Sequence, residues 1–562
     1  MSNKAWKIIP RPLLESILNN HASQHRVPQL LFLHGPRGVG KTTLILDRLF
    51  EDWNKGRHVT GYVDFGRSVQ NRQSSPWVSW SSTSPTPPSL TSVRLQLEHC
   101  LEEMVEKGVR LGCIGSNDVF ATLNRWHGLN TALRRILQNH ATIKTVDKRL
   151  KASTSVLWSR AVLAISSRLK TDEIDAILGF DEKENGITLE EKPHFREAIL
   201  SLRLAKEVIE VHQSWRANAI ADLNRTGGYS RSLAHSCTDW PYLLVELLSV
   251  TAETDYFQPK LVINNIEILR DAVLTDDSSV SASMYHDSFL WRLIALGVNE
   301  MSLPIILLTS DSYYSYQASA DFGYPDVFIS RETFGWTPKE AKMHLVTDYF
   351  SESEWMLIME VLGPNPRHLS ELYALKQSRD HPKIMQDING STFEDIVEAY
   401  LAYLQVTVVN PAMDLVLLIL QKFAADAQNG KISKDLLRFG APWRHPPRTT
   451  NPTLRSEWAK IQLLDFIQSL VNAEFGINYF ADRRLEFLED PCVTAMMEVG
   501  LLYKQRDPSF IRPVSRGIQR CLVRWLVQER MQMNFWQSLK YRWQRVIRGR
   551  SYRHLMREVG YK

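Results

Sequence analysis

Gly35-Pro-Arg-Gly-Val-Gly-Lys-Thr42 is the stretch that decides the fold expected for this chain. It fits the pattern G-x-x-x-x-G-K-[ST], in which glycines let successive backbone N–H groups curl around phosphate oxygens. In such a loop Lys41 reaches the outer phosphates and the hydroxyl of Thr42 is offered to Mg²⁺. The residues predicted to hold a nucleotide are therefore Gly35, Pro36, Arg37, Gly38, Val39, Gly40, Lys41, Thr42 and Thr43.

The flanking sequence supplies the context that this pattern requires. Gln29-Leu-Leu-Phe-Leu-His34 is typical of a buried strand, and Thr43-Leu-Ile-Leu-Asp-Arg-Leu-Phe50 is typical of a helix start. Strand, glycine loop and helix in this order favour a phosphate site. The alternative, a Gly/Pro turn with a surface lysine, does not require these neighbours.

Composition limits the class of protein. The chain has 562 residues, which favours about three or four domains, and 44% hydrophobic residues, which is typical of a globular core. We expect a soluble, intracellular protein, because no apolar run reaches about 18 residues and no secretory signal opens the chain. The cysteines indicate a reducing compartment and no zinc site, since Cys100, Cys113, Cys237, Cys492 and Cys521 form no C-x-x-C pair.

Strand-like and helix-like segments alternate, which predicts an α/β fold with a parallel sheet. The expected strands are 59–64, 260–265 and 303–309, and helical patterns separate them. A Ser- and Pro-rich loop at 74–92 and helices near 93–222 predict a large helical insertion. The predicted division is a nucleotide-binding domain at 1–70 and 230–335, an insertion at 71–229, a helical lid at 336–400, a winged-helix-like module at 401–515 and a basic amphipathic tail at 516–562.

The second expected strand of the site ends without the acidic pair that a hydrolysing enzyme normally places there. Asn264 and Asn265 follow Leu261-Val-Ile263. Asn264 can still hold Mg²⁺ through water, but an amide cannot act as a base. Glu267 is the candidate substitute if it faces the site; the alternative is a surface glutamate, because a helix starting here would point it elsewhere. Nucleotide binding is therefore expected, whereas hydrolysis is expected to be weak or slow.

Two further elements are candidates for contact with the outer phosphate. Thr309 and Ser310 end the third expected strand, where ligands of parallel sheets are commonly bound. Arg367, in Gly363-Pro-Asn-Pro-Arg-His-Leu369, opens a helix and can sense a bound phosphate through its guanidinium. The alternatives are an ordinary polar strand end and an exposed arginine at a proline-defined helix start.

Taken in order, these elements resemble the archaeal-type ATPases of the STAND branch of the AAA+ superfamily, and in particular the divergent members found in plants. The resemblance covers about residues 8–70 and 255–375 and rests on the glycine loop, residues 62–64, 261–265, 309–310, 334–341 and 363–369. It implies a P-loop NTPase fold in which Lys41 and Thr42 bind ATP and Mg²⁺, Thr309 or Ser310 has a sensor role, and Arg367 is the lid sensor. The Asn264–Asn265 pair and the long insertion depart from the family pattern and count against rapid turnover.

The C-terminal region carries the positive charge of the chain. Residues 511–562 contain thirteen Lys or Arg and two Glu, a net charge of +11 in a chain whose total is +5. Trp536, Leu539, Trp543 and Val546 recur at helical spacing, with Arg542, Arg545 and Arg548 on other faces. Such a helix suits nucleic acid, an anionic membrane surface or an acidic partner. The alternative is a helix that docks on the core by its aromatic face.

The function expected from the sequence is an ATP-binding switch that regulates assembly with a protein partner or a nucleotide-dependent oligomer. The alternative is a nucleic-acid-associated protein that uses the winged helix and the tail, with the nucleotide in a structural role. The sequence does not identify the partner.

Overall fold

The structure is a computed structural model that describes residues 6–66, 88–140, 153–167, 174, 192–226, 239–252, 256–273, 282–299, 302–315, 318, 321–322, 327–379, 392–432, 445–471, 477–478, 490–506 and 510–548. Most of the Ser- and Pro-rich loop expected at 74–92 lies outside these residues. So does the end of the basic tail after residue 548, and the side chains of residues 544–548 are not described.

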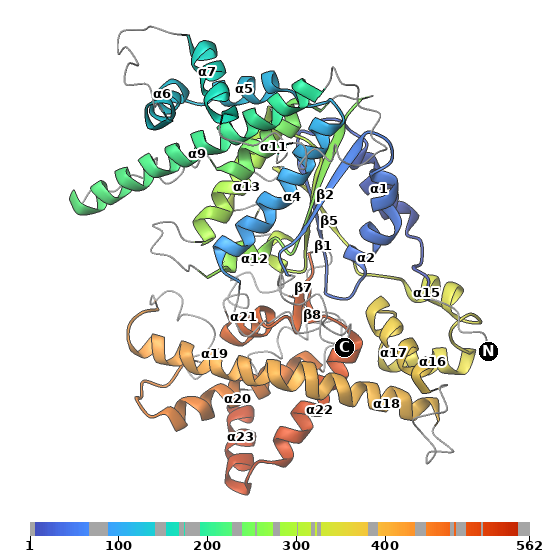
Figure 1. The fold of residues 1–562 in the computed structure, drawn as a ribbon. Coiled ribbons are helices and arrows are strands. Elements are labelled where there is room, and N and C mark those ends of the chain that lie inside the picture. Colours follow the sequence, from blue (N-terminus) through green and yellow to red (C-terminus); the bar gives the residue numbers. More distant parts are fainter. Residues whose placement is uncertain are drawn as a thin grey trace.

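A five-stranded parallel sheet lies at the centre of the molecule (Figure 1). All four strand pairs are parallel, which confirms the α/β class and the parallel sheet predicted from the sequence. In the order β2-β3-β4-β1-β5, the strands are His58–Asp64, Gln258–Asn264, Ile305–Thr309, Leu30–His34 and Phe328–Glu332. The edge strand β5 was not expected, because its sequence Phe-Ile-Ser-Arg-Glu lacks a continuous apolar run.

Alternating side chains of the strands build two cores, one on each face of the sheet. On one face, Leu31 and Leu33 pack with α1 (Pro12–Ala22) and with the helical run after the glycine loop. That run comprises α2 (Lys41–Leu44), a π-helical turn (Ile45–Leu49) and α3 (Phe50–Trp53). On the other face, Leu30 and Phe32 belong to a core that includes α4 (Leu90–Arg110), α11 (Trp240–Val250) and α13 (Ala282–Val298).

The described residues between β2 and β3 are mainly helical; α4 and α11 lie nearest the second face of the sheet, and the other helices pack beyond them (Figure 1). Besides α4 and α11 this segment contains α5 (Ser116–Asn124), α6 (Leu129–His140), α7 (Thr154–Ser166) and α9 (Lys192–Thr226). The helix expected at 118–139 is two helices, because Gly128 adopts a φ of +86° between them. After β3 comes the short α12 (Glu267–Asp271).

The described residues from Trp336 onward form a mainly helical unit below the carboxyl ends of the parallel strands (Figure 1). Its described helices share one core, which contains residues from Trp336 to Tyr541 and also Ile9 near the N-terminus. They are α15 (Pro338–Leu345), α16 (Glu352–Val361), α17 (Pro366–Arg379), α18 (Phe393–Leu404), α19 (Asn410–Gln428), α20 (Pro452–Val471), α21 (Pro491–Glu498), α22 (Arg516–Met531) and α23 (Phe535–Arg548). A small antiparallel sheet joins β6 (Ile477–Asn478), β8 (Phe510–Pro513) and β7 (Leu502–Lys504).

Two of the expected domain boundaries, at 400/401 and at 515/516, fall within this shared core. Residues 400 and 401 lie inside an uninterrupted helical run, Phe393–Gln428, in which a π-helical turn joins α18 to α19. This run is the one helix among the described residues that is long and apolar enough to cross a membrane, by length and composition only. Its inward side chains, including Tyr400 and Val416, are buried in the core, as expected of a core helix.

Candidate functional site

The glycine loop leaves β1 and enters α2 at the carboxyl edge of the sheet. Gly38 and Gly40 have φ values of +82° and +83°, a conformation that side chains disfavour. The amide groups of residues 38–43 donate no hydrogen bond to any residue that the structure describes. Such a row of free donors, at the start of a helix, is the arrangement that binds phosphate oxygens.

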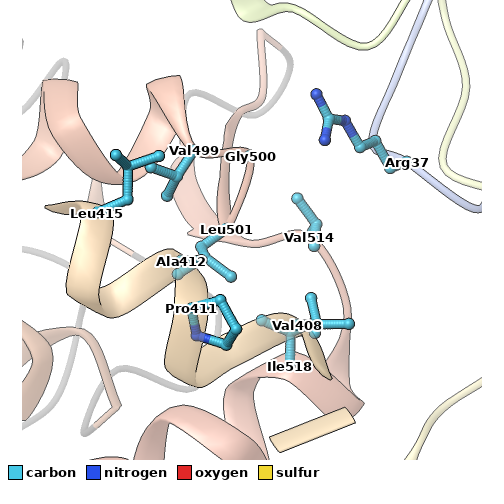
Figure 2. Close-up of a pocket in the computed structure, with 10 residues that line it drawn as sticks. All are labelled: Arg37, Val408, Pro411, Ala412, Leu415, Val499, Gly500, Leu501, Val514 and Ile518. Atoms are coloured by element: carbon cyan, nitrogen blue, oxygen red, sulfur yellow. The ribbon is translucent and has the colours of Figure 1, made fainter. Parts of the chain in front are cut away.

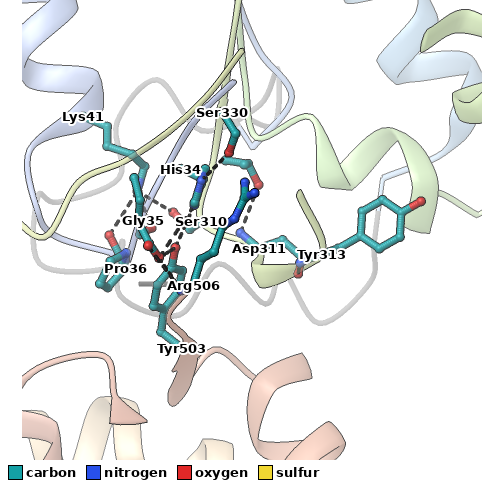
Figure 3. A network of polar contacts seen from close by, with 12 residues as sticks. His34, Gly35, Pro36, Lys41, Ser310, Asp311, Tyr313, Ser330, Tyr503 and Arg506 are labelled. Carbon is teal, nitrogen blue, oxygen red and sulfur yellow. Dashed lines mark hydrogen bonds and ion pairs between the residues drawn. The ribbon is translucent and has the colours of Figure 1, made fainter. Parts of the chain in front are cut away.

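Lys41 is buried, and its ammonium group folds back onto the carbonyl oxygens at the start of the glycine loop (Figure 3). Nζ donates to the carbonyl oxygens of Gly35 at 2.7 Å and Pro36 at 3.0 Å, and to the hydroxyl of Ser310 at 3.1 Å. Burial lowers the pKa of Lys41 to about 7, the charges of Arg37 and Arg11 add to this, and Glu267 partly opposes it. A bound phosphate would favour the protonated, positively charged form of Lys41, which burial disfavours.

Thr42 and Asn264 come together, as expected of residues that share a metal ion. The Thr42 hydroxyl lies 3.5 Å from Oδ1 of Asn264, which is buried at the end of β3. Asn265 points elsewhere: it has a φ of +57°, and its Nδ2 donates to Oδ1 of Asp64 at 2.7 Å. The two asparagines therefore have separate roles, and only Asn264 faces the loop. The side chain of Thr43, predicted to help hold the nucleotide, is exposed.

Glu267 lies in the site although it begins a helix. The hydroxyl of Thr309, at the end of β4, donates to its Oε2 at 2.7 Å. Burial raises the pKa of Glu267, with a further contribution from Asp311, while the hydrogen bond from Thr309 opposes the shift. The turn at Asn265 redirects the chain, so strand periodicity does not decide where residue 267 points. Thr309, Ser310 and Glu267 thus stand together beside Lys41.

The 363–369 segment packs directly on the loop. The amide of Arg367 donates to the carbonyl of Gly38 at 3.2 Å, and a Cβ on Gly38 would lie 2.9 Å from Oδ1 of Asn365. The guanidinium of Arg367, the expected sensor, binds Glu371 through Nε at 2.8 Å. Its backbone therefore touches the loop, while its side chain contacts a glutamate of its own helix.

Glu371 belongs to a buried polar chain that ties three helices together. It accepts a hydrogen bond from Tyr400 at 2.7 Å, and the Tyr400 oxygen lies 2.8 Å from Nδ1 of His368. Nε2 of His368 lies 2.7 Å from Oγ of Ser515, the cap of α22. Burial, with the charge of Arg367, lowers the pKa of His368 to about 3, so its ring is neutral at physiological pH.

The antiparallel strands β7 and β8, here called the C-terminal hairpin, reach the end of β1 from below the sheet (Figure 3). The Tyr503 hydroxyl donates to Oε1 of Glu332 at 2.9 Å and lies 3.0 Å from Nδ1 of His34. Nε2 of His34 lies 2.8 Å from Oγ of Ser330, and the amide of Arg506 donates to Glu332 at 3.2 Å. Burial, with the charges of Lys41 and Arg506, lowers the pKa of His34 to about 3.

Arg37 extends from the loop toward the same hairpin. A small cavity separates it from apolar side chains of α19, and the cavity is lined by Arg37, Val408, Pro411, Ala412, Leu415, Val499, Gly500, Leu501, Val514 and Ile518 (Figure 2). A Cβ on Gly500 would lie 2.8 Å from Nη1 of Arg37. Burial lowers the pKa of Arg37, although Glu267 and Asp311 oppose the shift.

Sequence reasoning missed the residues that join the loop to the C-terminal unit. His34, Glu332 and Tyr503 carry no motif, and Tyr503 lies 171 and 469 positions from its two partners. Asn365 lies in the 363–369 segment that the sequence singled out, but its packing against Gly38 was not expected. Asp311 was within reach of the sequence, since it extends the polar run of Thr309 and Ser310. It binds Arg270 at 2.8 Å and thereby anchors α12 beside the site.

A scan against protein-family models found no match for this chain, and a search of curated proteins found no significant relative.

Proposed function

We propose that the protein is an ATP-binding, Mg²⁺-dependent switch of the AAA+/STAND type with weak or slow hydrolysis. The observation that carries the proposal is the buried Lys41 inside a loop whose amide donors at 38–43 are free of described acceptors. These groups fit the phosphates of a nucleotide. Thr42 and Asn264, 3.5 Å apart, would hold Mg²⁺ together with phosphate oxygens, since Mg²⁺ sites often use few protein ligands.

The position of the C-terminal unit supports a switch. The same loop that would bind phosphate also touches Asn365, Arg367 and Gly500 of that unit. A phosphate in the loop would compete for Lys41 with the carbonyl oxygens of Gly35 and Pro36. We infer that this exchange changes the loop and so the packing of the lid and the winged-helix-like module, which regulates an unidentified protein partner or oligomer.

The hairpin supports a closing role for the winged-helix-like module. Tyr503 is buried against His34 and Glu332, and the amide of Arg506 also binds Glu332. A wing engaged in this way is not free to enter a nucleic-acid groove. We therefore favour a module that packs on the sheet over one that reads DNA.

Slow hydrolysis follows from the groups near Lys41. Asn264 offers an amide, and amides do not accept a proton from water. Glu267 is the candidate base, because its carboxylate lies in the site and accepts a hydrogen bond from the hydroxyl of Thr309 at the end of β4. Burial raises the pKa of Glu267, which makes its carboxylate more basic and therefore suited to accept a proton from water.

The test is equilibrium ATP binding to the full chain and to Lys41→Ala. We expect the variant to lose binding, because no other described ammonium group enters the loop. Lys260→Ala is the matched control: Lys260 is also buried, and burial lowers its pKa to about 8, but it lies at the other end of β3. Equal ATP affinity for Lys41→Ala and the unchanged chain would refute the proposal.

A further inference from the structure

The helix α23 presents its apolar face to solvent. Phe535, Trp536 and Trp543 are 75%, 76% and 67% exposed, and Leu539 is 48% exposed. At 100° per residue these four positions fall within about 100° of the helix circumference. The alternative interpretation, in which α23 docks on the core by its aromatic face, is therefore wrong for the described side chains.

Tyr541 fixes the orientation of this face. Among the described side chains of α23 it is the buried one, at 4% exposure, and it lies in the core of the C-terminal unit. Its position on the helix is about 190° from the middle of the apolar row. Because Tyr541 packs into the C-terminal unit, the opposite face of the helix points away from the protein. That face carries Phe535, Trp536, Leu539 and Trp543. Figure 1 shows α23 at the outer end of the C-terminal unit.

Cations border and follow the row. Arg542 is exposed, and by helical period it lies about 20° from Phe535. The sequence from 532 to 557 contains seven Lys or Arg and no Asp or Glu. A helix with Trp, Phe and Leu on one face and cations beside it is suited to the boundary between headgroups and acyl chains.

We propose that the exposed face of α23 docks the protein on a lipid bilayer that carries anionic headgroups. The aromatic and aliphatic side chains would enter the acyl boundary, and the cations would contact the headgroups. The proposal does not depend on nucleotide binding. It describes a helix lying in the surface of the bilayer, not one that crosses it.

The chemistry of the row favours this occupant over two others. A single-stranded nucleic acid stacks on aromatic rings, but Leu539 offers it neither a ring nor a hydrogen bond. A second copy of the chain would bring together two segments that each carry a net charge of +11 over residues 511–562. An anionic bilayer satisfies both the apolar row and the charge.

The experiment is flotation of the full chain with vesicles of phosphatidylcholine, with and without phosphatidylserine. We expect binding to the anionic vesicles, weaker binding to the neutral ones, and loss at high salt. The triple variant Trp536→Ser/Leu539→Ser/Trp543→Ser should lower the partition coefficient by at least about tenfold. Arg542→Glu should weaken anionic binding without affecting neutral vesicles.

The matched control is Leu163→Ser/Val298→Ser/Met343→Ser, which removes apolar side chains that are 68%, 72% and 71% exposed on other helices. It should bind vesicles as the unchanged chain does, and urea midpoints should show that both triple variants fold. Absence of binding by the unchanged chain, or equal binding by the α23 triple variant, would overturn the proposal. The proposal would also be overturned if vesicles do not bind, but the chain forms a dimer or an oligonucleotide complex that the α23 triple variant abolishes.

Discussion

The hydroxyl of Tyr503 lies 3.0 Å from Nδ1 of His34, across 469 positions of the chain. Because Tyr503 donates its proton to Glu332, its oxygen accepts one from His34, which places the ring proton on Nδ1. The C-terminal hairpin is thereby attached to the residue that precedes the glycine loop. On another side of the loop, the backbone N–H of Arg367 donates a hydrogen bond to the carbonyl oxygen of Gly38. The loop is held between two parts of the C-terminal unit.

Removing the Tyr503 hydroxyl should loosen this attachment. Tyr503→Phe removes the hydroxyl that Glu332 and Nδ1 of His34 share, while the contacts of Glu332 with Arg506 and of His34 with Ser330 remain. We expect a loss of about 1–3 kcal/mol in the free energy of unfolding, because a buried hydrogen-bonded group is removed. Urea unfolding measures the loss. Tyr313→Phe is the control, because the bond from Tyr313 to Asp321 is exposed and should cost about 0.5 kcal/mol or less. Equal costs for the two variants would contradict the buried linkage.

A side chain at Gly38 should separate the loop from the lid. Gly38→Ala meets both a positive φ and Oδ1 of Asn365 at 2.9 Å. Gly56→Ala is the matched control, since Gly56 has a φ of +68° with nothing within 4 Å of its added Cβ. Both variants should lose about 1 kcal/mol of stability from backbone strain. We expect Gly38→Ala alone to become more sensitive to limited proteolysis between the sheet and the C-terminal unit.

ATP binding should take up a proton at Lys41. The pKa of this lysine is lowered to about 7 in the absence of ATP, and phosphate charge would raise it. Above pH 7 the free protein holds fewer protons than the complex, so ATP affinity should fall as pH rises, by up to about tenfold per unit. Titration calorimetry in buffers of different ionisation enthalpy measures the uptake. Lys41→Arg should bind without it, because guanidinium does not titrate in this range.

Hydrolysis should depend on Glu267 while binding does not. Glu267→Gln keeps the hydrogen bond from Thr309 but removes the base, so single-turnover hydrolysis should fall by about 10²-fold or more with ATP affinity little changed. Asn264→Asp adds a carboxylate beside Thr42 and should strengthen Mg²⁺ binding and speed turnover. If Glu267→Gln hydrolyses ATP as fast as the unchanged chain, another residue supplies the base.

The site was partly accessible from sequence because its central parts are local. The glycine loop, Asn264 and Thr309 each follow an apolar strand, and strands in a parallel sheet end at a common edge. Glu267 was harder to place, because the left-handed turn at Asn265 is invisible in the pattern of residues. The sequence proposed Arg367 as a lid sensor, and that role stays a prediction; its pairing with Glu371 is an i,i+4 pair on one helix.

The sequence by itself determined the α/β class, the parallel sheet, the position of the glycine loop and the amphipathic row of α23, because these follow from short-range periodicity and composition. Only the tertiary structure decided that Tyr503 reaches His34, that Asn365 packs on Gly38, and that the aromatic row of α23 faces solvent. Those contacts join distant positions that no local pattern links. An amphipathic row shows which residues share a face, but the packing of neighbours such as Tyr541 decides where that face points.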